Sequence, residues 1–350
     1  MGPAAQALRR IAYLLERDGA DTYKVRAFRR AAASVDEVDP AHLEQLASSG
    51  GLRGLPNVGE TTARVIAEAV AGRVPGYLEE LEARETVALS TEALGLRAAL
   101  KGDCHSHSDW SDGGSPILEM AQTAAEIGHE YLVLTDHSPR LTVARGLSPE
   151  RLREQLGVVA EINERLAPFR LLTGIEVDIL EDGSLDQEDS LLAQLDLVVA
   201  SVHSKLAMAA PEMTRRMVRA VESPHSDILG HCTGRLITRK GRPPSSFDAA
   251  VVFEACAQSG TAVEINSRPE RRDPPEELLR FAVELGCLVS IDTDAHAPGQ
   301  LEWLGLGCEQ AVKAGVDPSF VVNSWPVEGL LGWTASRISP RPHLYQRPHR

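Results

Sequence analysis

The chain has 350 residues, 43% of them hydrophobic and 25% charged, and its net charge is −14. The length predicts two domains, or one large domain with an appendage, and the composition is typical of a soluble globular protein. The charge argues against a protein that coats nucleic acid along its whole surface but permits a local DNA contact. The sequence has no apolar run long enough to span a membrane and no convincing signal sequence. Its five cysteines are scattered, which suits a reducing compartment. We therefore expect a cytoplasmic protein that does not contact a membrane.

The first hundred residues predict helices and no strands. The stretch "LRGLPNVGETTARVIAEAV" at 52–70 contains a Pro-x-x-Gly turn followed by an amphipathic helix. It resembles a helix-hairpin-helix motif with Asn57 in the position of the usual first glycine. The resemblance implies that amides of the turn and of the helix N-terminus bind a nucleic-acid phosphate without reading bases.

Basic and aromatic residues alternate upstream of this motif, in "LLERDGADTYKVRAFRRAAASV". Their interleaving on one helix favours a second phosphate contact. The alternative is a helical packing unit without a ligand. The predicted DNA-binding residues are Lys24, Arg26, Arg29, Arg30, Asn57 and Gly59.

From residue 100 onward, apolar runs alternate with helical patterns at a spacing typical of βα units. Prolines at 149 and 211 mark helix starts, and glycines at 128, 260, 286 and 315 follow the last turns of helices. The pattern predicts a parallel sheet, either closed or doubly wound. The seven predicted strands lie in "KGDCHSHS", "YLVLTDHS", "RLLTGIEVDI", "LDLVVASVHS", "SDILGHCTG", "TAVEINSRP" and "CLVSIDTDAH".

Six of these seven strands end on histidine or an acidic residue. His105 and His107 alternate on the first strand and therefore point to one side. In a barrel, the C-terminal ends of all strands meet at one mouth, so these side chains would converge on a metal site. Such a set exceeds the needs of one tetrahedral ion and indicates two or three divalent cations. The alternative is a ring of hydrogen-bonded histidines at the barrel rim.

Residues 100–335 resemble the PHP family, named for polymerase and histidinol phosphatase. The resemblance implies a distorted (β/α)7 barrel, a trinuclear metal centre and hydrolysis of phosphoesters. It implies that Glu176 bridges two metals, that His105, His107 and Asp294 hold one of them, and that His203 and His231 hold the second. The full ligand set it implies is His105, His107, Asp112, His137, Glu176, His203, His231, Asp294 and His296.

Clustered cations would activate water and neutralise phosphate oxygens, with positive side chains at the mouth adding charge stabilisation. Arg235 and Arg268 are the candidates for this catalytic role beside Glu176, with ordinary surface arginines as the alternative. Imidazole-rich ligation favours Zn²⁺, Mn²⁺ or Fe²⁺ over Mg²⁺.

The predicted domains are therefore an all-α helix-hairpin-helix domain over 1–85, a linker over 86–100, a PHP barrel over 101–336 and a loose tail over 337–350. Residues 6–85 also resemble the N-terminal domain of bacterial family X DNA polymerases, but the linker leaves no room for their polymerase domain.

We expect a metal-dependent phosphoesterase that binds DNA and processes its 3′ ends in DNA repair. The activities that the resemblance implies are those of an exonuclease, a 3′-phosphatase or an abasic-site nuclease, with a repair polymerase as a possible partner in trans. The alternatives are a small-molecule phosphatase of the histidinol-phosphate type and a DNA-binding accessory protein with a structural metal centre.

Overall fold

The computed structural model describes residues 2–84 and 87–338, so most of the predicted tail, at 339–350, lies outside the described residues. The chain divides into two compact units. The first holds residues 1–88 together with 297–302, and the second holds 89–296 and 303–350.

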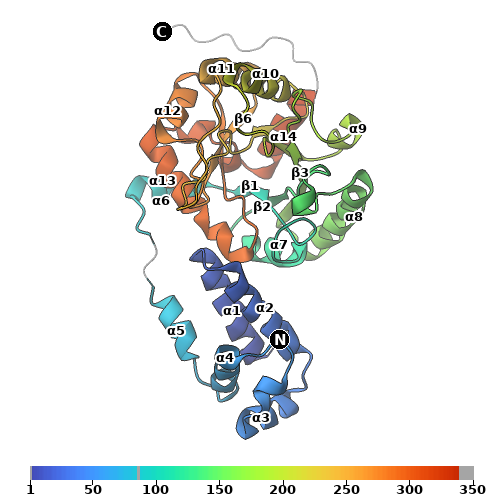
Figure 1. Ribbon diagram of the computed structural model, residues 1–350, viewed down its shortest axis with the longest axis vertical. Helices are drawn as coiled ribbons and strands as arrows, with labels where there is room; N and C mark the ends of the chain where they lie inside the picture. The colour runs from blue at the N-terminus through green and yellow to red at the C-terminus, as the bar shows by residue number, and fades with distance from the viewer. Residues whose placement is uncertain (1, 85–86, 339–350) are drawn as a thin grey trace. The chain divides into compact units, whose positions relative to one another are not determined.

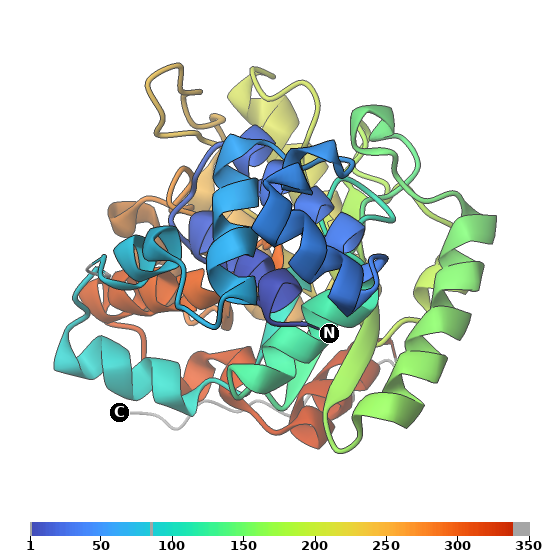
Figure 2. The same cartoon turned by 90° about the horizontal axis from the view of Figure 1, so that it is seen from below.

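The N-terminal part of the first unit is helical, as predicted, and is drawn in blue to cyan in Figures 1 and 2. Aspartates cap two of its helices, since Asp21 accepts a hydrogen bond from the backbone of Tyr23, and Asp39 from that of Ala41. Apolar side chains from several helices, such as Leu8 of α1, form one core. The elements are α1 (Pro3–Arg17), α2 (Thr22–Asp36), α3 (Pro40–Ser49), the 3-10 turn η1 (Gly51–Gly54), α4 (Glu60–Val70) and α5 (Gly76–Glu82).

The second unit contains one sheet of seven parallel strands in chain order. A parallel bridge between Ser106 and Ala295 joins the first strand to the end of the last, so the sheet nearly closes on itself. The prediction of a (β/α)7 barrel behind an all-α domain is confirmed. The strands are β1 (Gly102–Ser106), β2 (Tyr131–Leu134), β3 (Arg170–Asp178), β4 (Leu197–Ser201), β5 (Ile228–Leu229), β6 (Ala262–Asn266) and β7 (Val289–Asp292).

Helices surround these strands, and their ends follow the signals in the sequence. Helix α8 begins at Pro149, capped by Ser148, while Gly260 and Gly315 adopt left-handed backbone angles just beyond α11 and α13. No helix of residues 2–84 and 87–338 has the length and apolar character of a membrane span. The helices of this unit are α6 (Thr91–Ala99), α7 (Ile117–Glu126), α8 (Pro149–Leu166), α9 (Asp189–Leu192), α10 (Ala210–Val221), α11 (Ala249–Ser259), α12 (Glu276–Glu284), α13 (Leu304–Ala314) and α14 (Val327–Ile338).

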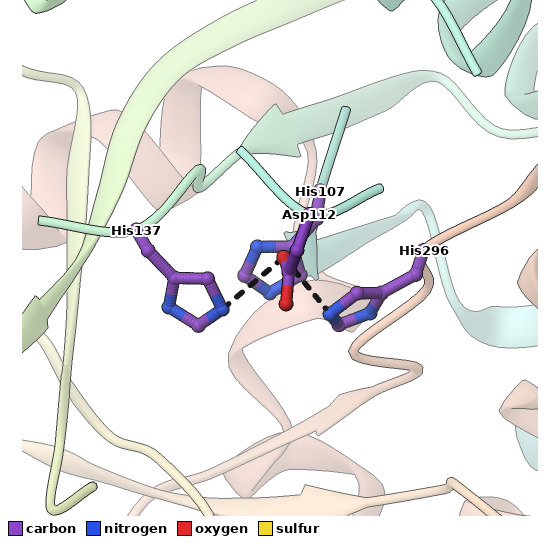
Figure 3. Close-up of side chains that lie close together, drawn as sticks. All are labelled: His107, Asp112, His137 and His296. Carbon is purple, nitrogen blue, oxygen red and sulfur yellow. Dashed lines mark ion pairs between the residues drawn. The ribbon is translucent and has the colours of Figure 1, made fainter. Parts of the chain in front are cut away.

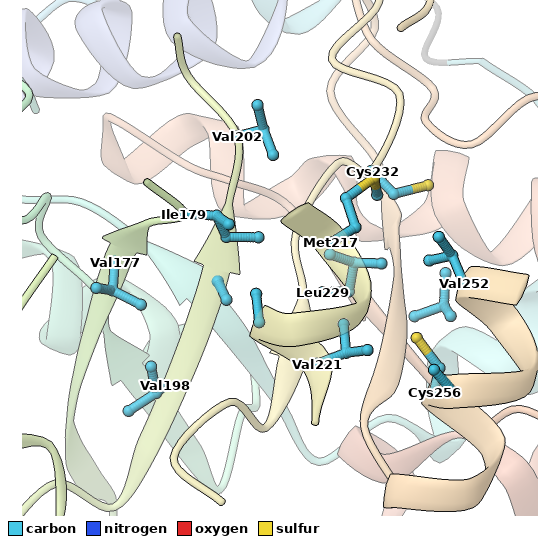
Figure 4. Packing of buried hydrophobic residues seen from close by; sticks show 14 of the residues in the cluster. Val177, Ile179, Val198, Val202, Met217, Val221, Leu229, Cys232, Val252 and Cys256 are labelled. Carbon is cyan, nitrogen blue, oxygen red and sulfur yellow. The ribbon is translucent and has the colours of Figure 1, made fainter. Parts of the chain in front are cut away.

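The largest apolar cluster of the barrel lies between strands β3–β5 and helices α10 and α11 (Figure 4). Val177, Val198 and Leu229 come from the strands, while Met217 and Val252 come from the helices, and all five are buried. Because this core fixes the strands rigidly, it also fixes the residues at their C-terminal ends.

The segment predicted as a linker, 86–100, contains helix α6. Ser90 caps this helix, and its hydroxyl donates to Glu309 of α13 at 2.9 Å. Ala93 and Leu96 are buried in a core with residues of α13 such as Leu304. Most of the segment therefore belongs to the barrel unit, because the apolar face of α6 packs against α13. The two helices lie more than 200 residues apart in the sequence.

Helix α14 is anchored to the barrel by the buried guanidinium of Arg337. It donates to the carbonyl oxygens of Ser259 at 2.6 Å and Ser226 at 2.5 Å, and its Nε lies 3.3 Å from Asp227 Oδ1. Burial raises the pKa of Asp227 to about 7, although the charge of Arg337 acts to lower it.

Replacing Arg337 with methionine is expected to destabilise the barrel by about 3 kcal/mol, because it removes the charged partner of the buried Asp227 carboxylate and the donor to the Ser259 carbonyl. The free energy of unfolding in urea measures this. Arg280→Met on α12 is the matched control, since half of the Arg280 side chain is exposed. Equal stability of the two variants would contradict the anchoring role.

Candidate metal centre

The barrel delivers all nine predicted ligand residues to the C-terminal ends of its strands. His105 lies in β1 and Glu176 in β3, while His203 and His231 lie two residues beyond β4 and β5. Eight of the nine are buried or nearly so, and Asp112, in the loop after β1, is the most exposed, with 37% of its side chain accessible. Parallel strands of one barrel bring their ends together, which explains why positions far apart in the sequence meet here.

Glu176 lies at the centre of the cluster, and its two carboxylate oxygens face different histidines. Oε1 lies 2.9 Å from His231 Nε2 and 3.2 Å from His203 Nε2. Oε2 lies 2.8 Å from His137 Nδ1 and 3.4 Å from His105 Nε2. A carboxylate with this geometry can hold two cations at once.

Ligand-type atoms fall into three overlapping groups, in each of which they lie within 4.8 Å of one another. His107 and His137 each belong to two of the groups, so the groups are contiguous. Between them they contain every predicted ligand except His231, which faces Glu176. The groups are His107, Asp112, His137 and His296; His105, His107 and Asp294; and His137, Glu176 and His203.

Figure 3 shows the first of these groups, in which Asp112 lies between two imidazoles. Its Oδ1 is 3.4 Å from His137 Nε2 and 3.3 Å from His296 Nε2. The loop that carries Asp112 is held by the buried carboxylate of Asp136, which accepts hydrogen bonds from the Ser108 hydroxyl at 2.6 Å and the Ser111 hydroxyl at 2.5 Å.

Asp294 adopts a left-handed backbone angle of φ 53°, which aspartate tolerates better than most residues. Its Oδ2 accepts from Asn266 at 3.2 Å and pairs with Arg271 Nε at 3.2 Å, while Oδ1 faces His107 Nε2 at 3.3 Å. Its carbonyl accepts from His296 Nδ1 at 2.8 Å. One carboxylate oxygen of Asp294 and Nε2 of His296 are thereby turned toward the cluster.

The electrostatics of the cluster fit bound cations. Burial alone would raise the pKa of Glu176, but the nearby His203, His105 and His137 hold it well below its usual range. Burial lowers the pKa of His107 to about 3, so this imidazole is neutral and has a lone pair to offer.

Several buried ligand atoms also have no hydrogen-bond partner among the described residues. They include His105 Nε2, both ring nitrogens of His107 and Glu176 Oε2. Buried polar atoms without partners are costly, and metal ions would satisfy all of them together. The donor set, rich in imidazole with bridging-type carboxylate, therefore fits divalent transition metals.

Glu264 of β6 was not predicted as a site residue, because β6 is the one strand without a ligand at its end. Its carboxylate is fully buried and lies 2.5 Å from His105 Nδ1, and it also accepts a hydrogen bond from the backbone of His231. This contact leaves His105 Nε2 facing Glu176. Carboxylates that orient metal-binding histidines in this way fix the tautomer and raise the basicity of the ligand. The sequence feature that could have identified Glu264 is an acidic residue within the otherwise apolar strand segment "TAVEIN".

Glu264→Gln is expected to weaken metal affinity about 10- to 100-fold, the range found for partners that orient histidine ligands. Competition with a chromophoric chelator measures the affinity directly, without reference to activity. Glu254→Gln, an exposed residue of α11, is the matched control. An unchanged affinity in Glu264→Gln would show that Glu264 does not position His105.

A cavity of about 340 Å³ opens above the cluster. Arg268 and Arg271 line it, whereas Arg235 does not. Arg235 instead donates to the backbone carbonyls of Arg271, at 3.0 Å, and of Arg272. Although Arg235 lies near His231 in the sequence, its side chain supports the loop that carries Arg268 and Arg271.

The two arginines at the cavity differ in their partners. Arg268 donates to Glu270 Oε1 at 2.9 Å and to the carbonyl of Asp294 at 2.9 Å. Its guanidinium is therefore already hydrogen-bonded to residues beside the cluster. Arg271 pairs with Asp294, but its buried Nη1 has no hydrogen-bond partner among the described residues. Arg271, which was not predicted, is thus the better placed of the two to meet an anion.

The predicted DNA-binding residues of α2 also differ among themselves. Arg26 and Arg30 are exposed and one helical turn apart. Arg29 forms a two-point ion pair with Glu16, at 2.5 and 2.8 Å, and the Lys24 ammonium lies 5.1 Å from the ring centroid of Tyr77. Lys24, Arg26 and Arg30 are thus the exposed side chains of the four, and of these three Lys24 already lies near an aromatic ring.

The hairpin residues Asn57 and Gly59 occupy the turn before α4. Asn57 has φ 60°, the conformation that a glycine usually supplies in this motif, and its amide donates to Ser34 of α2 at 3.1 Å. Gly59 is the N-cap of α4, and its own amide donates to Thr62 Oγ1 at 2.9 Å. The hairpin is intact, but the Gly59 amide is already engaged within the chain.

Two domain models match the chain, one in each of its two units. A helix-hairpin-helix domain model matches residues 3–74, and a PHP domain model matches residues 103–268. The DNA polymerase/3′-5′ exonuclease PolX of Bacillus subtilis is 38% identical over 250 residues, which cover 71% of this chain but only 43% of PolX. A protein of Thermoanaerobacter sp. named "Probable phosphatase" is 27% identical over 233 residues, covering 63% of this chain and 89% of its own. A solved histidinol phosphate phosphatase from Lactococcus lactis has a TM-score of 0.45 and 19% identity, covering 62% of this chain and 94% of its own.

Proposed function

This chain carries a helix-hairpin-helix domain followed by a PHP domain, and on that premise we propose that it is a metal-dependent phosphoesterase that processes the 3′ ends of DNA. The observation that carries the proposal is the complete cluster around Glu176 in the same chain as a helix-hairpin-helix domain. Relatives named as phosphatases support the hydrolytic chemistry, and the similarity to PolX supports DNA as the substrate.

Two or three Zn²⁺, Mn²⁺ or Fe²⁺ ions would be held by the nine ligands, with Glu176 between two of them. His105, His107 and Asp294 would hold one ion, His203 and His231 a second, and Asp112, His137 and His296 a third. When bound, such ions supply a hydroxide nucleophile at neutral pH and neutralise phosphate oxygens.

The side chains around the ligands complete the site. Arg271 would bind a non-bridging oxygen of the scissile phosphate through its unpartnered Nη1. Arg268 would hold the Asp294 carbonyl, and through it His296, in position. Glu264 would keep His105 in the tautomer that exposes Nε2.

The main alternative is a small-molecule phosphatase of the histidinol-phosphate type, to which the chain's phosphatase relatives give some support. A second alternative is a DNA-binding accessory protein with a structural metal centre. The open cavity that the ligands line favours a catalytic centre over a structural one, whose coordination sphere would be closed.

The direct test is an assay of the Mn²⁺-loaded protein on three labelled duplexes, with a recessed 3′ end, a 3′-phosphate or an abasic site, beside histidinol phosphate. We expect release of nucleotide or phosphate from at least one duplex. Hydrolysis of histidinol phosphate without turnover of any duplex would favour the small-molecule alternative, and no hydrolysis at all would favour the accessory protein.

Arg26→Ala/Arg30→Ala is expected to weaken binding to recessed duplex DNA about tenfold or more at about 0.1 M salt, because two phosphate contacts are lost. Fluorescence anisotropy of labelled DNA measures the dissociation constant. The control is Arg10→Ala/Arg84→Ala, which removes the same charge from side chains that pair with Glu82 and Asp18. Equal weakening by both pairs would indicate a general charge effect and not a local contact by α2.

A further inference from the structure

Two loops beside the metal cluster expose large apolar side chains. Val143, in the 3-10 turn η2 (Thr142–Ala144) after β2, is 88% exposed, and Ile237, in the loop after β5, is 51% exposed. Val143 and Leu236 line the same cavity as the metal-cluster residues His137 and Glu176. Exposed Val143 and half-buried Leu236 thus give an otherwise polar cavity an apolar wall, which indicates contact with an apolar part of a ligand.

The turn that carries Val143 is ordered and tied to the cluster. The amide of Leu147 donates to the carbonyl of His137 at 2.7 Å, and Arg151 Nη1 donates to the carbonyl of Arg145 at 2.8 Å. Gly146 packs on the Ser138 carbonyl so closely that a Cβ would not fit. Val143 is therefore presented to solvent by a braced turn and not by a loose loop.

The loop after β5 forms a short hairpin. Leu236 and Arg242 exchange backbone hydrogen bonds of 2.9 Å, and the amide of Gly241 donates to the carbonyl of Thr238 at 2.8 Å. The hairpin is fixed to the cavity wall because the amide of Ile237 donates to the carbonyl of Glu270 at 2.8 Å.

Two cationic side chains occupy the tip of this hairpin. Arg239 and Lys240 are exposed, and no ion pair links either of them to another described residue. They differ in this from Arg268 and Arg271, which pair with Glu270 and Asp294. Free cations on an anchored hairpin in a protein of net charge −14 form a local site for anions.

We infer that the turn at 142–144 and the hairpin at 236–242 form the binding site for the single-stranded end of a polynucleotide. The terminal base lies against Val143 and Leu236, and the phosphates that precede the scissile bond contact Arg239 and Lys240. This inference rests on the proposed function and specifies its substrate as a strand, since a small phosphate monoester has no further phosphates for the hairpin tip. The faces of nucleic-acid bases are apolar and match Val143 and Leu236, while the anionic backbone matches Arg239 and Lys240.

Arg239→Ala/Lys240→Ala in the full chain tests the hairpin tip. Across a salt series, kcat/KM for a single-stranded oligodeoxynucleotide is expected to depend less steeply on salt, with a logarithmic slope smaller by about 1.4 for two lost contacts. The ratio of kcat/KM for the oligonucleotide to that for p-nitrophenyl phosphate is expected to fall about 20-fold at about 0.1 M salt. The control is Arg165→Ala/Arg170→Ala, which replaces two exposed arginines, one in the last turn of α8 and one at the start of β3, at the end of the barrel opposite the mouth.

Val143→Ser tests the apolar contact. Wild-type protein is expected to cleave an oligonucleotide that lacks its terminal base about five- to tenfold less efficiently than the intact one, and Val143→Ser is expected to reduce this discrimination. An exposed valine can be replaced with little effect on folding, so the variant reports on the contact itself.

The outcomes separate this inference from the proposed function. An unchanged salt slope in Arg239→Ala/Lys240→Ala, in a protein that does cleave DNA, would overturn the hairpin site and leave the proposed function standing. Hydrolysis of p-nitrophenyl phosphate by wild-type protein without any cleavage of DNA would overturn the proposed function and the inference with it.

Discussion

Replacing Glu176 with glutamine is expected to lower kcat/KM for phosphoester hydrolysis by about 10³-fold, because a metal ion contributes several kcal/mol of transition-state stabilisation and each 1.4 kcal/mol corresponds to a factor of ten. Both oxygens of Glu176 face histidines of the cluster, at 2.8–2.9 Å for the two nearest. Glutamine has nearly the same shape but offers one weaker oxygen and an N–H₂ group, so it cannot bridge two cations.

Metal analysis by mass spectrometry should show that Glu176→Gln retains fewer ions per chain than the wild type. Its circular dichroism spectrum should remain that of the folded protein, since the substitution removes a buried charge without changing volume. Glu181→Gln, an exposed residue just beyond β3, is the matched control. Full activity with full metal content in Glu176→Gln would contradict the bridging role.

Removal of the metals is expected to lower the thermal midpoint of the barrel by about 10 °C or more. An ion present at 1,000 times its dissociation constant adds about 4 kcal/mol to the free energy of unfolding, and 1 kcal/mol moves the midpoint of a domain of this size by about 2–4 °C. Without ions, the buried atoms His105 Nε2 and Glu176 Oε2 have no hydrogen-bond partner among the described residues. Differential scanning calorimetry before and after chelation measures the shift.

Readdition of Mn²⁺ or Zn²⁺ should restore the midpoint, which separates metal loss from irreversible damage. The shift should be smaller in Glu176→Gln, since that variant holds fewer ions to lose. A wild-type midpoint that does not respond to chelation would mean that the cluster binds no ion with useful affinity.

The barrel and the gathering of the nine candidate ligands were accessible from the sequence because both depend on periodic features. Strands alternating with helices specify a parallel sheet, and the sheet brings its strand ends to one mouth. His137 and His231 could therefore be expected to meet, although 94 residues separate them in the chain (231 minus 137).

Roles that depend on side-chain direction could not be predicted in this way. Arg235 and Arg271 both lie in loops at the mouth, but only Arg271 lines the cavity, while Arg235 bonds to backbone carbonyls. Arg29 is one of four basic residues on α2, and only the packing of α1 against α2 shows that Glu16 already neutralises it. Glu264 acts through His105, a partner 159 positions away that no local pattern reveals.

The most direct test of the proposed function is a comparison of kcat/KM for a 3′-recessed duplex and for histidinol phosphate, on one Mn²⁺-loaded preparation with Glu176→Gln as the blank. We predict a higher kcat/KM for the DNA, abolished in Glu176→Gln for both substrates. Efficient turnover of histidinol phosphate with no release of nucleotide or phosphate from DNA would contradict the proposed function.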